Sequence, residues 1–215
     1  MNRKIMAIVL VATLALALSA TAFAQTEEDF TVEVTRDGRG VRITGYKGSV
    51  TDVVIPATIQ GFPVREVGFY PPNENITSIV IPEGVTKIGG FLESSNLRSV
   101  TLPSTLTEIA SNAFFYCRNL KTITLPASLE TIGEGAFDGS GLTEIALPAS
   151  IKRIGDAAFA RCSALTTVTV PASVQRIDFM RTTFRRVSDG AFMGCHNLSL
   201  ASQAALRRVG YQGEF

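Results

Sequence analysis

Apolar and polar positions recur along this chain with a period of just over twenty residues. Successive prolines of the repeat are spaced by 26, 21, 23, 22 and 23 residues, and apolar residues keep fixed offsets from them. These prolines are Pro56, Pro82, Pro103, Pro126, Pro148 and Pro171, and a phenylalanine column follows at Phe91, Phe114, Phe137, Phe159 and Phe192. A period of this length indicates a solenoid, in which each unit is too small to bury its own apolar face.

Each repeat predicts one coil of the solenoid. In residues 122–125, Ile123 and Leu125 alternate with Thr122 and Thr124, which predicts a strand with the threonines outside. Proline ends the strand because it has no N–H for the ladder. The later Gly-x-x-Ala-Phe segment is expected to turn back as one helical or 3-10 turn. Each coil buries roughly six large apolar side chains, so we expect it to fold only when its neighbours cover it.

The repeat Leu-x-x-Ile-x-Leu-Pro-x-Ser-Leu-x-x-Ile-Gly-x-x-Ala-Phe-x-x-Cys-x-x-Leu resembles the BspA-like leucine-rich repeats of bacteria. The resemblance recurs five or six times between residues 53 and 200. It implies a leucine-rich-repeat solenoid, a β-rich right-handed coil of about six repeats. It also implies export by a bacterium, with adhesion or protein binding at the cell exterior.

Residues 1–24 are interpreted as a signal peptide. Arg3 and Lys4 precede an apolar run over residues 5–18, and a small-x-small site at Ala24 precedes Gln25. The rival interpretation is a transmembrane anchor, but the run is short for a span. We therefore predict cleavage at Ala24/Gln25 and a mature chain that is secreted, at the cell surface or periplasmic, with no membrane span.

Both ends of the repeat region are expected to be capped. Residues 25–52 alternate on either side of Asp37-Gly38, which predicts a β-hairpin covering the first coil. Residues 201–215 form the C-terminal cap and tail. A capping helix is predicted from Ser202 to Val209, with Ser202 as its N-cap and Gly210 at its end. The tail that contains Tyr211 is expected to be disordered or loosely packed.

The charge balance excludes some partners. The formal net charge is +1, and removal of Arg3 and Lys4 makes it −1. This balance gives no indication of nucleic acid or an anionic membrane as the partner.

The three cysteines occupy equivalent positions, three residues before the leucine column. One interpretation is a ladder of small buried thiols formed by Cys117, Cys162 and Cys195, with Gly139 replacing the thiol in one coil. The other is a disulfide between Cys162 and Cys195, which lie in consecutive coils of an exported protein.

The sequence gives little support to catalysis. His196 is the only histidine, and its variable position beside Cys195 predicts a solvent-facing turn. No His-Glu-x-x-His, paired Cys-x-x-Cys or phosphate-binding glycine loop is present, so we expect no metal and no cofactor.

The outward strand positions predict a Ser- and Thr-rich ribbon with little charge. Its candidate ligand-binding residues are Thr101, Thr122, Thr124, Thr167 and Thr169. The alternative is that threonine simply suits exposed strand positions.

An insertion over residues 178–187 interrupts the last repeat. Its aromatic and arginine side chains have the composition of a binding hot spot. The candidate residues are Phe179, Arg181, Phe184, Arg185 and Arg186. The alternative is a decorative hairpin whose aromatic residues pack on the last coil.

Three classes of function follow. The favoured class is an extracellular protein-binding or adhesion module, whose partner is a host matrix protein, a bacterial surface protein or a glycan. The second class is a structural envelope-associated repeat without a high-affinity ligand. A hydrolase that uses His196 is the remote third, because the repeats supply no cleft with convergent polar groups.

Overall fold

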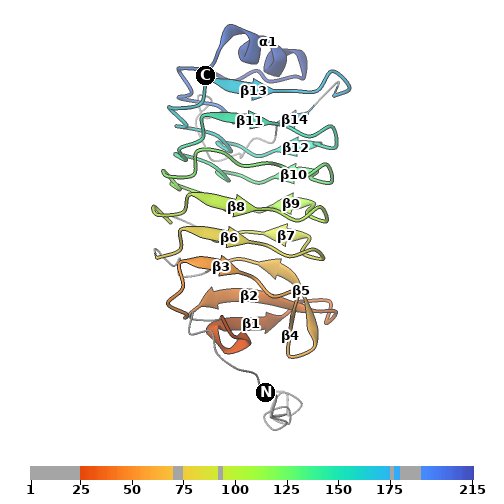
Figure 1. Ribbon diagram of the computed structural model, residues 1–215. Coiled ribbons are helices and arrows are strands. Elements are labelled where there is room, and N and C mark those ends of the chain that lie inside the picture. The colour runs from red at the N-terminus through yellow and green to blue at the C-terminus, as the bar shows by residue number, and fades with distance from the viewer. Residues whose placement is uncertain (1–24, 70–74, 92–93, 175–176, 180–189) are drawn as a thin grey trace.

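The structure is a computed structural model that describes residues 25–69, 75–91, 94–174, 177–179 and 190–215. The coils stack into an elongated solenoid, with a β-hairpin at the N-terminal end and one helix at the C-terminal end (Figure 1). Strands from successive coils lie side by side and pair in parallel. The predicted leucine-rich-repeat solenoid is therefore confirmed.

One long side of the solenoid is a nine-stranded sheet. Its order is β1-β2-β5-β7-β9-β10-β12-β14, and β4 pairs with β5. From β2 onward the neighbours along this path run parallel, because each coil of the stack adds a strand in the same direction. The strands are β1 (Phe30–Val34), β2 (Val41–Tyr46), β4 (Thr58–Ile59), β5 (Phe62–Val67), β7 (Lys87–Ile88), β9 (Glu108–Ile109), β10 (Thr131–Ile132), β12 (Arg153–Ile154) and β14 (Asp178–Phe179).

A second side carries two short parallel sheets. The first has the order β3-β6-β8 and the second pairs β11 with β13. In each of these strands the central residue is buried and the last residue is exposed, as the alternation predicted. The strands are β3 (Asp52–Val54), β6 (Ser78–Val80), β8 (Ser99–Thr101), β11 (Glu144–Ala146) and β13 (Thr167–Thr169).

The prediction of a strand over residues 122–125 is wrong. This segment belongs to the coil between β8 and β11, yet it pairs with neither sheet. The alternation itself persists, because Ile123 is buried while Thr122 and Thr124 are exposed. Alternation determines which side chains face the core, whereas ladder pairing depends on how closely the neighbouring coils approach.

The phenylalanine column runs along the core as a stack of rings. The five rings are at most 1 % exposed. Successive centroids within the column are 5.0–5.5 Å apart, with interplanar angles between 7° and 17°. Phe69 extends the column at its N-terminal end, and Tyr211 closes it edge-on at the C-terminal end, 5.4 Å from Phe192. The shared apolar interior that the repeat predicted is thus present.

The Gly-x-x-Ala-Phe segments form turns that bond to the next coil. The N–H of Phe114 donates to the carbonyl of Ala136 at 2.6 Å, and the N–H of Phe137 donates to Ala158 at 2.7 Å. Amides that donate to the next coil alternate with amides that donate three residues back, as Asp138 does to Gly135, so the segments form a run of turns in place of the one helical or 3-10 turn that we expected.

The N-terminal cap is the predicted hairpin. A 3-10 turn η1 (Glu27–Asp29) leads into β1, which pairs antiparallel with β2. Gln25 already belongs to this cap: its Oε1 accepts the N–H of Val54 at 2.7 Å, and its Nε2 donates to the Tyr46 hydroxyl at 3.2 Å. The side chain of Gln25 therefore satisfies an amide at the open edge of β3.

The C-terminal cap is helix α1 (Leu200–Arg208), which begins earlier than predicted. Its N-cap is Ser199, whose Oγ accepts the N–H of Ser202. Ser202 is buried inside the helix, where its Oγ accepts the N–H of Val168 in β13 at 2.9 Å. Ser202, which was predicted to be the N-cap, therefore accepts a strand N–H that a further coil would otherwise bind.

The expectation of a loosely packed tail is wrong. Tyr211 is 2 % exposed. Its hydroxyl accepts the N–H of Phe192 at 3.1 Å and donates to the carbonyl of Glu214 at 2.7 Å. At the same end the Arg208 guanidinium donates to the carbonyls of Val174 and Pro171. Side chains of the cap therefore satisfy backbone groups that another coil would otherwise cover.

Candidate functional site

The two short sheets present an exposed array of two rows, which we call the ribbon. Parallel pairing holds the rows in register within each short sheet, and the unpaired segment 122–125 lies between the two sheets. The ribbon consists of Asp52, Ser78, Ser99, Thr122, Glu144 and Thr167 in one row, and of Val54, Val80, Thr101, Thr124, Ala146 and Thr169 in the other. All of these side chains are exposed except Ser78, which is half-buried.

The ribbon hydroxyls differ from the hydroxyls at its border. Thr143 and Thr166 lie just before β11 and β13, and each donates to a backbone carbonyl of the preceding coil. The hydroxyls of Thr101, Thr124 and Thr169 make no hydrogen bond to another described residue. These hydroxyl groups are therefore available to a ligand.

At its N-terminal end the ribbon extends one coil further than predicted, to Asp52 and Val54. Val54 and Val80 are 56 % and 39 % exposed, so two β-branched apolar side chains extend the outer row. Beside them, hydrogen bonds from Ser78 and then Thr77 lower the pKa of Asp52 below its ordinary value. The signal was present in the sequence, because Val53 and Ile55 show the same alternation as the later coils.

The predicted insertion is described only in part. Phe179 lies in β14 and pairs with Ile154, so it takes the column position that the repeat spacing assigned to Ile177. The insertion was predicted to start at residue 178. Because Phe179 pairs with Ile154, two extra residues already precede residue 178 in this coil. Arg181, Phe184, Arg185 and Arg186 lie outside the described residues.

Phe179 faces the C-terminal cap. Its ring centroid is 5.1 Å from that of Tyr211, and the side chain is half-buried against the core. This placement matches the packing alternative for Phe179, because much of its ring already contacts the protein.

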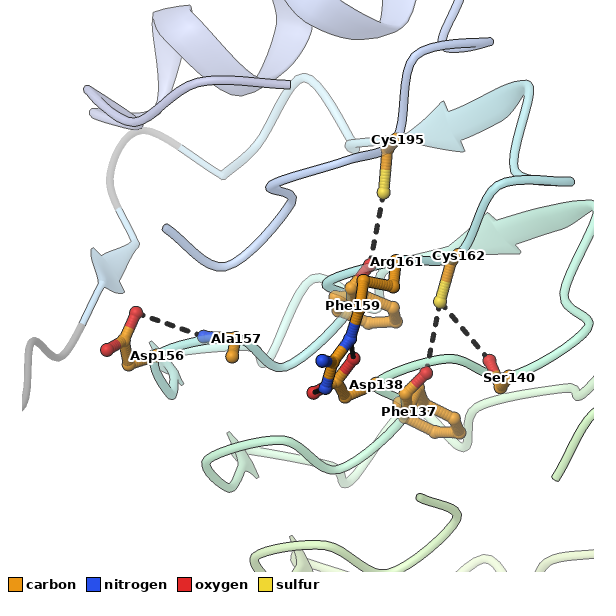
Figure 2. A network of polar contacts seen from close by, with 9 residues as sticks. All are labelled: Phe137, Asp138, Ser140, Asp156, Ala157, Phe159, Arg161, Cys162 and Cys195. Atoms are coloured by element: carbon orange, nitrogen blue, oxygen red, sulfur yellow. Dashed lines mark hydrogen bonds and ion pairs between the residues drawn. The ribbon is translucent and has the colours of Figure 1, made fainter. Parts of the chain in front are cut away.

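The three cysteines form the predicted ladder of buried thiols, and Figure 2 shows Cys162 and Cys195. All three are free, and each Sγ donates to the carbonyl of the column phenylalanine in the preceding coil, at 3.0–3.2 Å. Burial raises the pKa of Cys117 to about 12 and that of Cys162 to about 11. Thiols with such pKa values are poor nucleophiles near neutral pH.

Serine, not Gly139, replaces the thiol in the intervening coil. Ser140 is 4 % exposed, and its Oγ lies 3.3 Å from the Sγ of Cys162. The thiol position lies three residues after the column phenylalanine in every coil. The prediction counted three residues back from Leu142, which gives Gly139 because this coil is one residue shorter. His196 is exposed, as predicted.

Nothing in the described part of the chain is arranged as a metal site or a membrane span. None of its His, Cys, Asp and Glu side chains gather in threes in a way that could hold a metal ion. The described segments also contain no helix with the length and apolar character needed to cross a membrane.

The outward row of the nine-stranded sheet is charged and contains an ion pair between Lys87 and Glu108. Glu33, Arg42, Glu66, Lys87 and Glu108 are neighbours in register from β1 to β9, so the sign alternates along the row. The Nζ of Lys87 lies 2.8 Å from Glu108 Oε1. A ligand on this face would have to compete with these contacts, whereas the ribbon offers few charges.

Comparison with known proteins shows the class to which this chain belongs. The BspA type leucine rich repeat region matches residues 64–199 in six copies. The chain is therefore a member of this family of leucine-rich-repeat proteins. The fold of the family is in general non-catalytic and serves protein interaction. No curated protein matches the chain.

Solved bacterial structures share the fold. A T. pallidum leucine-rich-repeat protein is 28 % identical with a TM-score of 0.63, and the match covers 89 % of this chain and 98 % of that one. A leucine-rich-repeat protein from Bacteroides ovatus is 30 % identical with a TM-score of 0.66, and the match covers 79 % of this chain but 44 % of the longer relative. A similar protein from Bacteroides capillosus is 28 % identical with a TM-score of 0.50, with 69 % of this chain and 98 % of that chain covered.

Proposed function

We propose that this protein is an exported binding module that recognises another protein through the ribbon and has no catalytic activity. The observation that carries the proposal is the exposed array of threonine and valine side chains on the ribbon, in which the hydroxyls of Thr101, Thr124 and Thr169 make no hydrogen bond to another described residue. Interfaces of this kind combine apolar contact with a small number of hydrogen bonds.

Export is part of the proposal. The predicted cleavage after Ala24 would leave Gln25 as the first residue, and the contacts of its side chain with Val54 and Tyr46 belong to the described fold. Intact-mass measurement of protein recovered outside the cytoplasm is expected to give a chain that begins at Gln25. A full-length mass in that fraction would contradict the cleavage.

The ribbon is tested by placing charge on it. Thr101→Lys with Thr124→Lys puts two long cations on adjacent coils of the ribbon. The matched control is Thr86→Lys with Thr107→Lys, because these exposed threonines lie on adjacent coils beside the nine-stranded sheet. We expect wild type and control to capture the same envelope or host matrix protein in a cross-linking pull-down, and the ribbon variant to lose it.

Each result has a consequence. A partner captured equally by the ribbon variant would show that recognition lies elsewhere. Failure of the wild type to capture any protein would favour the structural alternative, an envelope-associated repeat without a high-affinity ligand. Activity in a hydrolase substrate panel that is lost in His196→Ala would overturn the non-catalytic part of the proposal.

A further inference from the structure

A small basic hollow lies beside the ribbon, on the turns that lead into it. Its volume is about 350 Å³, and its lining includes Tyr116, Arg118, Lys121, Arg161 and Ser163. Lys121 directly precedes Thr122 of the ribbon, and Ser163 lies shortly before β13. Side chains from two coils that are not consecutive therefore meet at one place on the surface.

Glycines line the floor of this hollow. A Cβ on Gly139 would come within 3.1 Å of the Tyr116 ring, and a Cβ on Gly141 would meet the carbonyl of Arg118 and the Nζ of Lys121. The ring and the ammonium thus lie directly on bare backbone, and a side chain at either glycine would fill the space.

Two residues of the hollow have a backbone conformation that side chains rarely adopt. Tyr116 has φ 55° and Arg161 has φ 56°, both in the left-handed region. The equivalent position is glycine in two other coils, Gly139 and Gly194, and Glu93 in a third. Left-handed backbone at bulky residues is unfavourable and is found preferentially at functional sites. A binding role for these two side chains gives this departure from glycine a reason.

Arg161 is held in place by a buried carboxylate. Its guanidinium forms a bidentate ion pair with Asp138, which is 2 % exposed, and its Nε lies 2.8 Å from Asp138 Oδ1 (Figure 2). The guanidinium carbon also lies 5.3 Å from the Tyr116 ring centroid. These contacts fix the position of one cation before any ligand arrives.

Arg118 and Lys121 supply further positive charge. The guanidinium carbon of Arg118 lies 5.0 Å from the Tyr116 centroid, and Lys121 Nζ donates to the carbonyl of Arg118 at 3.0 Å. Neither side chain has a carboxylate partner among the described residues. Three cations therefore line the hollow, and the buried carboxylate of Asp138 next to it is already bound by Arg161.

The position of the guanidinium groups decides the class of ligand. Sugars commonly pack on the face of an aromatic ring, but here two guanidinium groups lie over the Tyr116 ring. What remains available is an array of N–H donors, which suits the planar carboxylate of Asp, Glu or a chain terminus. We propose that this hollow is a binding site for the carboxylates of an acidic peptide segment. The proposal rests on the hollow's own residues and does not depend on the ribbon.

The test uses charge removal with a matched control. Binding of a fluorescein-labelled hexaglutamate peptide is measured by anisotropy at low ionic strength, with hexaglutamine as the neutral comparison. The site variant is Arg118→Gln with Lys121→Gln, which leaves Arg161 and its buried partner intact. The control is Lys152→Gln with Arg153→Gln, which removes the same charge from the nine-stranded sheet.

We expect hexaglutamate to bind the wild type and the control alike, and the site variant to bind at least about fivefold more weakly, since two exposed ion pairs are lost. Equal weakening in both variants would show attraction by net charge alone and overturn the site. The site is also overturned if hexaglutamate does not bind the wild type. Tighter binding of a sulfated polysaccharide that hexaglutamate cannot displace would assign the hollow to a glycan instead.

Discussion

Truncation of one ring in the phenylalanine column gives the sharpest test of the shared core. Phe137 is fully buried, and its centroid lies 5.2 Å from both Phe114 and Phe159. Phe→Ala at a buried site costs about 3–5 kcal/mol in the free energy of unfolding. Each stacked contact adds about 0.5–1.5 kcal/mol beyond area burial. We therefore expect Phe137→Ala to lower the free energy of unfolding by about 5 kcal/mol, at the upper end of the range.

This loss is large relative to the stability of a typical domain, about 5–15 kcal/mol. Phe137→Leu keeps an apolar side chain but removes both ring contacts, and we expect it to cost about 1–2 kcal/mol. Phe62 is the matched control because it is 44 % exposed and lies outside the column. Phe62→Ala is expected to change stability by less than about 0.5 kcal/mol.

The measurement is urea unfolding followed by far-ultraviolet circular dichroism. The expected order of midpoints is wild type and Phe62→Ala together, then Phe137→Leu, then Phe137→Ala. Equal midpoints for Phe137→Ala and Phe62→Ala would show that the column does not hold the coils together. A broad transition in Phe137→Ala alone would still agree with a solenoid whose two halves have lost their coupling.

Two further predictions concern titratable groups in the core. Because burial raises the thiol pKa values, we expect folded protein at pH 8 to resist alkylation. Denatured, unreduced protein is expected to take up three adducts, counted by mass spectrometry, because all three cysteines are free. Fewer adducts would indicate a disulfide. Tyr211→Phe leaves the N–H of Phe192 unsatisfied and is expected to cost about 1–3 kcal/mol. Burial also raises the pKa of Tyr211 from 10.0 to about 12, so its contribution is complete below pH 10 and is lost as the pH rises toward 12. The stability difference between wild type and Tyr211→Phe should shrink over that interval, and a constant difference would contradict the assignment.

The repeat made most of the fold predictable, because each column position is defined many times. The buried phenylalanines, the thiol ladder and the exposed His196 all follow from averaging over coils. Where the length of a coil differs from the others, the column positions predicted from the repeat are wrong. The shorter coil moved the thiol position from Gly139 to Ser140, and the last repeat placed Phe179 opposite Ile154.

The ends and the hollow were not predictable for a different reason. Tyr211 and Ser202 belong to the cap and have no equivalents in the repeats. Their roles depend on backbone N–H groups of the last coils, those of Phe192 and Val168, which no further coil binds. The hollow joins Tyr116 to Arg161, which are 45 residues apart. A signal did exist in the sequence, because two other coils have glycine at this position, Gly139 and Gly194, but only the backbone angles give that position its meaning.

The closed ends and the charge pattern together restrict where this protein can bind. At one end β1 pairs antiparallel and interrupts the parallel stack, and at the other Ser202, Arg208 and Tyr211 satisfy the backbone groups of the last coil. Growth by end-to-end stacking is therefore disfavoured, and recognition is left to the sides. Of these, the nine-stranded face has an ion pair between Lys87 and Glu108 that a ligand would have to displace. The ribbon and the adjoining basic hollow offer the hydroxyls of Thr101 and Thr124 and the cations of Arg118 and Lys121, which have no carboxylate partner among the described residues, and the functional proposals therefore rest on them.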